Sequence, residues 1–269
     1  MRRLRCAVAA VLFAACAVAQ SATPRPAFEA FEVATIKPTG PDARGRFFRM
    51  QTAQQFVAQN HALKPLIAAA YNLHPDTILG GAAWVDSDHY DIRAKTPGEV
   101  RPNLDEQMAM LRNLLAERFS LKFHREQKDL PVYALTGAKG GPKLTESTTS
   151  PDASPEGPPP LIFVISPALV RLPARNATMA ELASIMQRAA LDRPVIDRTG
   201  LSARYDFDLE FTPDETVFGG AFAAPPATDD VAKPDLRAAM QQQLGLRLEA
   251  TKGPVALLMI DHAERPSAN

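Results

Sequence analysis

The sequence predicts an α+β fold made of two tandem αβ units, each with a small mixed or antiparallel sheet and two helices. Helical and alternating apolar patterns follow one another along the chain, as such units require. Blocks of similar sequence recur in the same order, 115 to 125 positions apart, and a proline-rich segment separates the two sets. With 269 residues, 46% of them hydrophobic, the chain is long enough for one or two domains with real cores.

Four pairs of blocks carry this internal repeat. Residues 60–63 match 176–179, 90–92 match 205–207, 119–123 match 244–248, and 128–132 resemble 252–255. The spacing drifts because loops lengthen as duplicated units diverge. Each unit is therefore predicted to contain a leading strand, a helix, two strands, a second helix and two further strands.

The first helix of each unit is predicted by an apolar stripe at positions i, i+3, i+4 and i+7. Residues 63–70 carry this stripe, and Pro65 is tolerated because it falls in the first turn. Residues 179–186 repeat the stripe after Thr178, which is placed to form a capping box with Glu181. Both segments therefore present one apolar face.

A second helix in each unit follows the same logic. Asn103 is predicted to cap a helix over 104–115, with Glu106 placed to complete the capping box. Leu236, Met240 and Leu244 repeat the apolar stripe in the second unit.

The strands are clearest in the second unit. Residues 194–196 are predicted to form a short strand closed by a polar turn, and 205–211 alternate apolar with acidic side chains. Near the end of the chain, 246–249 and 255–260 are predicted to pair as a hairpin across 252–254.

Composition divides the chain into regions. Residues 145–160 are rich in Pro, Ser and Thr, and are predicted to be a linker between a first unit, 20–144, and a second unit, 161–269. A second irregular stretch, 212–234, is predicted to be a long surface loop inside the second unit. Such a linker would let both units bind one partner together.

Residues 1–19 have the features of a cleaved signal peptide. A basic start over 1–5 precedes an apolar stretch that ends in small residues, which predicts cleavage before Gln20. Cys16 leaves open the alternative of a lipoprotein acylated at this thiol. We expect a periplasmic or extracellular protein with no membrane span after cleavage.

Cleavage would change the balance of charge and sulfur. The whole chain has 30 basic and 30 acidic residues, and removing the first 19 leaves 27 basic and 30 acidic residues, a net charge of −3. Both cysteines, Cys6 and Cys16, would leave with the signal, so the mature chain would have no disulfide and no thiol ligand. This balance argues against a nucleic-acid-binding protein.

Distinctive blocks extend over nearly the whole mature chain. They are 31–38, 69–71, 84–92, 111–123, the Pro-Val-Ile-Asp-Arg-Thr-Gly-Leu block at 194–201, 205–207, 243–246 and 260–262. In these blocks the chain resembles an uncharacterised family of secreted proteins, much expanded in Acidobacteria, that carries a domain of unknown function. The resemblance implies an envelope or secreted protein with no assigned activity. Each unit is also similar in pattern to the small αβ domains at the N-termini of secretins and outer-membrane receptors.

Three candidate ligand-binding residues lie in the first unit. Trp84, the sole tryptophan, could act as a stacking platform, and Asp86 and Tyr90 follow it in a polar stretch. The alternatives are a core tryptophan and an ordinary turn that leads into a strand.

Four more candidates lie in the second unit. Arg193 and Arg198 flank a short strand and could hold a carboxylate of a peptide or cell-wall fragment. Alternatively, Asp197 caps the turn and pairs with one arginine. Tyr205 begins the strand that matches the one at Tyr90.

The sequence contains no recognisable catalytic, metal or cofactor motif. The five histidines form no H-E-x-x-H pair, and no G-x-x-x-x-G-K-[ST] or G-x-G-x-x-G motif occurs. The aspartates within 86–91 have the wrong spacing for a calcium loop. The Gly-rich, basic segment 137–141 leads into the linker rather than into a helix, so we interpret it as a flexible exit loop rather than a phosphate site.

These observations favour a non-catalytic module that binds a protein or a cell-envelope ligand, with no cofactor, metal or nucleic acid. Exposed edges of small sheets suit strand addition by a partner. The alternative is a metal-free hydrolase with an Asp/His site between the two units, which requires an apolar cleft there.

Overall fold

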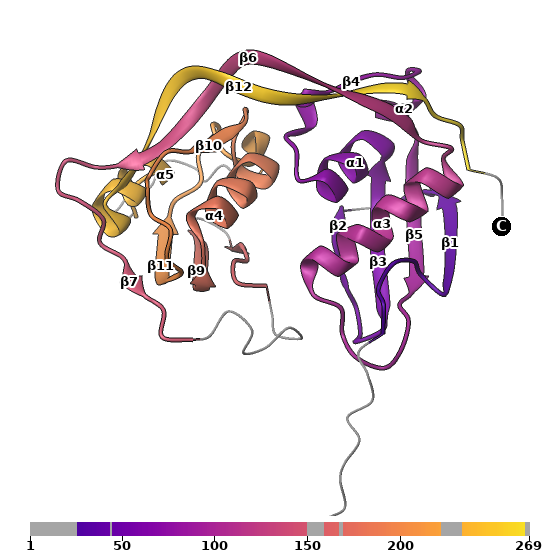
Figure 1. Cartoon of the computed structure of the whole chain (residues 1–269), viewed down its shortest axis with the longest axis horizontal. Helices are drawn as coiled ribbons and strands as arrows, with labels where there is room; N and C mark the ends of the chain where they lie inside the picture. The colour runs from indigo at the N-terminus through magenta and orange to yellow at the C-terminus, as the bar shows by residue number, and fades with distance from the viewer. Residues whose placement is uncertain (1–25, 44, 150–158, 167–168, 222–232, 267–269) are drawn as a thin grey trace, which may run out of the picture.

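The computed structural model of the chain describes residues 26–43, 45–149, 159–166, 169–221 and 233–266. Two lobes lie side by side beneath a long two-stranded ribbon that spans them both (Figure 1). Each lobe has a four-stranded sheet, helices and its own hydrophobic core. The α+β class is therefore confirmed, whereas the predicted signal peptide, 1–19, lies outside the described residues.

The first lobe is built on an antiparallel sheet with the strand order β1-β5-β3-β2. Its strands are β1 (Val33–Pro38), β2 (Phe47–Met50), β3 (Gln55–Ala62) and β5 (His89–Lys95). Helices α1 (Leu63–Tyr71) and α3 (Leu104–Arg118) contact each other and bury their apolar stripes in the core. The short elements between them are η1 (Pro75–Thr77), β4 (Ile78–Gly80) and α2 (Trp84–Ser87).

The second lobe is built on an antiparallel sheet with the strand order β7-β11-β9-β8. Its strands are β7 (Thr145–Glu146), β8 (Val164–Ser166), β9 (Leu169–Ala177) and β11 (Tyr205–Phe211). Helix α4 (Met179–Ile185) continues as a π-helical turn, η2 (Met186–Ala190). Helix α5 (Leu236–Ala239) likewise continues into η4 (Met240–Leu244), so the second helix predicted there is confirmed.

Both predicted capping boxes are confirmed. The Glu106 N–H donates to the Asn103 side chain at 2.9 Å, and the Glu106 carboxylate accepts the Asn103 N–H at 2.6 Å. Thr178 and Glu181 make the same reciprocal pair at 3.1 and 2.7 Å. Each N-cap of this kind stabilises the fold by about 1 kcal/mol.

The ribbon consists of two unusually long strands. Strand β6 (Lys122–Gly137) pairs antiparallel with β12 (Leu246–His262) along nearly its full length. Strand β4 pairs with β12 in parallel and flanks one end of the ribbon. Parallel to β6, β10 (Val195–Asp197) flanks the other end, which gives the order β10-β6-β12-β4.

The hairpin predicted across 252–254 is wrong, because β12 runs through this segment without a turn. Pro254 lies opposite Asp129 of β6. Among the described strands, β4 and β10 flank the ribbon only near its ends, and in its middle β6 and β12 pair only with each other. Proline lacks an N–H, and Pro131 and Pro254 are tolerated here because no further strand has to pair with them.

Each core is completed by strands from both halves of the sequence. Tyr133 and Leu135 of β6 lie in the core of the second lobe, whereas Leu258 and Ile260 of β12 lie in the core of the first. The ribbon therefore exchanges strands between the two predicted units, and neither unit encloses its core alone.

The predicted linker and loop are only partly covered by the structure. Thr145 and Glu146, assigned to the linker, form β7 and pair with β11. In the predicted loop, Val217 is buried and Phe218 begins η3 (Phe218–Gly220). Within these two predicted segments, residues 150–158 and 222–232 lie outside the described residues.

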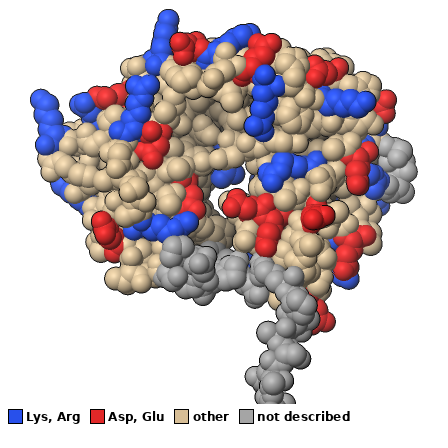
Figure 2. Space-filling view, in the orientation of Figure 1, with Lys and Arg blue, Asp and Glu red and all other residues tan. Residues whose placement is uncertain are grey.

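The lobes also contact each other below the ribbon, through polar groups. The Asn72 side-chain amide donates to the Ser184 hydroxyl at 2.8 Å, and the Gln187 side-chain amide donates to the Asn72 carbonyl oxygen at 3.1 Å. The end of α1 is thereby joined to α4 and η2. On the face drawn in Figure 2, acidic and basic side chains are interspersed over both lobes.

Candidate functional site

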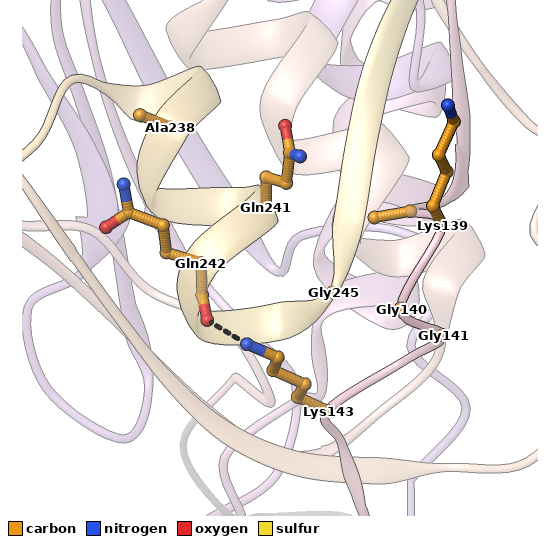
Figure 3. A pocket seen from close by; sticks show the side chains of 9 residues that line it. Lys139, Gly140, Gly141, Lys143, Ala238, Gln241, Gln242 and Gly245 are labelled. Atoms are coloured by element: carbon orange, nitrogen blue, oxygen red, sulfur yellow. Dashed lines mark hydrogen bonds between the residues drawn. The ribbon is translucent and has the colours of Figure 1, made fainter.

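A pocket of about 430 Å³ lies at one end of the ribbon, where β6 leaves the sheet and η4 ends. Figure 3 shows Lys139 and Lys143 on the loop that follows β6; the Lys143 ammonium is directed at the helix turn that carries Gln242, whereas the Lys139 side chain runs upward beside the ribbon. The other lining residues are small: Ala138, Gly140, Gly141, Ala238 and Gly245.

The loop and the helix end are held together by main-chain hydrogen bonds. The Ala138 N–H donates to the Gly245 carbonyl oxygen, and the Lys143 N–H to the Leu244 carbonyl oxygen, both at 2.8 Å. Gly245 has a φ of 63° and ends η4, and a Cβ there would collide with the carbonyl oxygen of Gly141. Glycine is therefore required at this close approach.

The side chains that line the pocket carry a net positive charge. Lys139 and Lys143 are two of the nine lining residues, and none of the nine is acidic. The Lys143 Nζ donates to the Gln242 main-chain carbonyl oxygen at 2.9 Å, where it complements the carbonyl end of the helix. The pocket can therefore accept negatively charged or hydrogen-bond-accepting groups.

The candidates from the first unit lie apart from this pocket. Trp84 is 8% exposed and stacks on Phe119, with ring centroids 6.5 Å apart, so it is a core residue rather than an exposed platform. Tyr90 is also buried and contacts Phe119 edge-on at 5.3 Å, and this burial raises the pKa of its hydroxyl. Asp86 is exposed and pairs with Lys64 at 2.8 Å.

The candidates from the second unit are likewise held in local contacts. Arg193 pairs with Asp192 and lies over the Tyr133 ring, 4.8 Å from its centroid. The Asp197 carboxylate accepts hydrogen bonds from the Thr199 N–H at 2.9 Å and from the Thr199 hydroxyl at 2.8 Å. Asp197 therefore caps the turn, which is the alternative predicted for it from the sequence.

The two remaining candidates are Arg198 and Tyr205. The Arg198 N–H donates to the Leu135 carbonyl oxygen, and the residue is exposed. Tyr205 is 6% exposed and lies in the core of the second lobe. None of the seven candidates lines the pocket at η4, and their ligand-binding role stays a prediction.

One histidine, His74, lies between the lobes, where the hydrolase alternative requires a site. A cavity of about 150 Å³ there is lined by His74, Thr77 and Gln187 with apolar neighbours, and no carboxylate is among its described lining residues. The His74 Nε2 lies 3.2 Å from the Leu191 carbonyl oxygen, and its Nδ1 accepts the Asp76 N–H at 3.2 Å. Both ring nitrogens are thus bonded to the main chain, as in a structural histidine.

Among the described residues, an Asp–His pair within hydrogen-bond distance lies on the ribbon instead. His124 Nδ1 is 2.7 Å from Asp261 Oδ1, and this hydrogen bond raises the pKa of His124. Nearby, His262 contacts Glu264 at 3.1 Å, and Ser120 donates to the same carboxylate at 3.0 Å. These side chains are exposed, so they lack the water-excluding environment that strengthens electrostatic catalysis.

Within the described ranges, no group of three or more His, Cys, Asp or Glu side chains is arranged to hold a metal ion. None of the described helices has the length and apolar character needed to cross a membrane.

Sequence reasoning missed the pocket at η4. The Gly-rich basic segment 137–141 was the available indication of a site there. The helix that completes the pocket, η4, lies about 100 positions further along the chain, and its carbonyl end rather than an N-terminus lies at the pocket. Lys143 and Gln242 meet only because the ribbon brings Gly137 opposite Leu246.

These features define a two-lobed α+β protein whose lobes exchange strands through one ribbon. The chain belongs to the family described as "Protein of unknown function (DUF3738)", whose model matches residues 64–263. This range runs from the second residue of α1 to just beyond the end of the ribbon, and it confirms the predicted domain of unknown function. No curated protein and no solved structure matches the chain.

Proposed function

We propose that the protein is a non-catalytic, exported module that docks another envelope protein by strand addition at the outer edge of the second-lobe sheet. The observation that carries this proposal is an apolar, solvent-exposed strand, β8, at the edge of that sheet. An exposed edge offers N–H and C=O groups to a further strand, and apolar side chains along it favour such pairing.

The exposed edge extends beyond the three residues of β8. Strand β8 pairs antiparallel with β9, and Leu161 continues this register by bridging Ala174. The Pro160 carbonyl oxygen then accepts the Arg175 N–H at 2.9 Å. Residues 160–166, here called the docking edge, therefore follow β9 along one side, and among the described strands none pairs with their other side.

The side chains of the docking edge indicate what would bind there. Ile162 and Val164 are 52% and 51% exposed and share one face, because side chains two positions apart point the same way in a strand. Leu161 is buried and Phe163 packs against the core. No residue from 161 to 166 is charged, so we expect an extended partner segment with apolar side chains at alternate positions.

The remaining edges of the two lobe sheets are protected in the usual ways. Strand β1 ends in Lys37 and Pro38, β2 is short and carries Arg49, and β7 contains only Thr145 and Glu146. Charges, proline and short length all discourage edge pairing. The contrast supports a role for the docking edge in recognition.

Export and duplication belong to the same proposal. The basic and apolar start of the chain supports secretion to the periplasm or beyond. The matched order of elements supports two copies of one unit, since β4 follows the first helix and flanks β12, while β10 follows the corresponding helix and flanks β6. In the duplicated units the last strands, β6 and β12, would have changed places, so that β6 contributes to the core of the second lobe and β12 to the core of the first.

The proposal is tested with a displayed library of random peptides selected against the purified protein. We expect enriched peptides that are extended, with alternating β-branched and apolar residues, and that protect amides of 160–166 from hydrogen exchange. Val164→Lys should weaken their binding at least about tenfold, because it places a desolvated charge in the interface. Val33→Lys is the matched control, since Val33 is 62% exposed on another edge strand.

Three outcomes would overturn the proposal. Selected peptides could bind elsewhere or bind Val164→Lys as tightly as the wild type. Light scattering could instead reveal a dimer that Val164→Lys dissociates, which would assign the docking edge to a second copy of the chain.

A further inference from the structure

We infer that the pocket between the loop 138–143 and η4 binds a small oxyanion ligand, one that carries a carboxylate or a phosphate group. This inference does not depend on strand docking at β8. It rests on the charge of the lining, on the available hydrogen-bond donors, and on Gly140, where neither the backbone conformation nor the packing requires glycine.

The charge of the lining favours an anion. Lys139 and Lys143 come from the same loop and stand at different ends of the pocket (Figure 3). The chain as a whole has a formal net charge of zero, so a lining with two cations and no acid is a local departure from its composition. Ammonium groups attract oxyanions and repel cations.

Donors remain available for a ligand. Lys143 uses one of the three N–H groups of its ammonium on the Gln242 carbonyl oxygen, and Lys139 forms no ion pair with the described residues. The side-chain amides of Gln241 and Gln242 have no hydrogen-bond partner in the described part of the chain. The Gln242 side-chain amide points away from the loop (Figure 3), so the donors left for an oxyanion and the groups next to it are the two ammonium groups and the Gln241 amide.

Gly140 lines the pocket, and neither its backbone conformation nor its packing requires a glycine. It has no positive φ, and a Cβ built on it would meet no atom within 4 Å. By contrast, Gly245 is required by both its backbone conformation and its packing. The missing side chain at Gly140 keeps its main chain open to a bound molecule, which is a common use of glycine.

The size of the pocket sets the scale of the ligand. Its volume of about 430 Å³ falls within the range of roughly 300–1,000 Å³ that small-molecule sites occupy. Because the pocket is open and its polar groups are exposed, we expect moderate affinity that weakens as salt screens the lysines.

The experiment is a titration of isotope-labelled protein, followed by NMR of the amides of Gly140, Gly141 and Gly245. The probes are inorganic phosphate and glutarate, with glutaramide as the uncharged analogue of glutarate. We expect saturable shifts of these three amides with at least one oxyanion and none with glutaramide. Response to phosphate alone would identify a phosphate-bearing ligand, and response to glutarate alone a carboxylate-bearing one.

Two variants separate binding from folding. Lys139→Gln should weaken the oxyanion about tenfold, as expected for the loss of a charge-assisted contact. Lys252→Gln removes an equal charge from the exposed surface of the ribbon and should leave the affinity unchanged. Gly140→Val should block binding while the unfolding midpoint stays at the wild-type value, because the added side chain meets only open space. Absence of saturable shifts, or equal weakening by Lys139→Gln and Lys252→Gln, would overturn the inference.

Discussion

Asn60 and Asn176 occupy the same place in the two lobes, three residues before α1 and α4, and both adopt a left-handed backbone with φ values of 60° and 56°. Their N–H groups donate to side-chain oxygens on the neighbouring strand, Asp91 at 2.9 Å and Asp206 at 2.7 Å. The strand pairing shifts register beside both of them. Asparagine is among the few residues other than glycine that adopt this conformation readily.

This relationship predicts a specific response to mutation. Asn60→Ala and Asn176→Ala should each lower the free energy of unfolding by about 1–2 kcal/mol, because alanine is strained at positive φ. Asn176→Gly relieves that strain and should cost less than Asn176→Ala. Urea denaturation measures all three, and equal losses for Asn176→Ala and Asn176→Gly would contradict a backbone origin.

The exchanged ribbon predicts that the halves of the chain depend on each other. A fragment of residues 20–144 lacks Leu258 and Ile260, which belong to the first-lobe core, so it should not form a compact monomer. Adding a fragment of 145–269 should restore a one-to-one complex with cooperative unfolding. Circular dichroism and size-exclusion chromatography follow both steps, and cooperative unfolding of 20–144 by itself would contradict this dependence.

His61 predicts a loss of stability at acidic pH. Burial, together with the charge of Arg46, lowers the pKa of His61 to about 4. Its Nε2 lies 3.1 Å from the Phe47 carbonyl oxygen, while its Nδ1 is buried without a described hydrogen-bond partner, so a second proton would have no acceptor. An unfolded histidine titrates at about 6.5. The folded state therefore binds fewer protons between these values, and its stability falls as the pH drops from about 6.5 towards 4.

The measurement is the urea midpoint at several pH values between 7 and 4.5. The slope attributable to His61 is at most about 1.4 kcal/mol per pH unit. His61→Gln should flatten the decline, whereas His262→Gln, at an exposed position, should leave it unchanged. A decline of the same steepness in both variants would assign it to other groups.

Gly245 and Gly140 predict opposite responses in the same pocket. Gly245→Ala combines a positive φ with a collision against the Gly141 carbonyl oxygen, and should destabilise the protein by about 2–4 kcal/mol. Gly140→Ala meets neither obstacle and should be neutral or slightly stabilising. Thermal unfolding distinguishes the two, and similar losses would contradict the close approach of the loop to the end of η4.

The candidate site illustrates where sequence reasoning stops. Trp84 and Tyr90 were predicted as possible contacts, but large aromatic side chains gain most from burial and both lie in the core. The pocket draws on Lys139 and Lys143 from one part of the chain and on Gln241 and Gln242 from a part about 100 positions away. No pattern of neighbouring residues in the sequence indicates that these two segments lie together.

The sequence by itself determined the α+β class, the helix caps at Asn103 and Thr178, the apolar stripes and the alternating strand at Tyr205–Phe211, because each depends on spacing within a few turns or residues. The tertiary structure decided the course of the last strand. Gly253 and Pro254 favour a turn locally, but pairing with β6 over the whole of β12 forms far more hydrogen bonds than a local hairpin could, so the strand continues and completes the core of the opposite lobe.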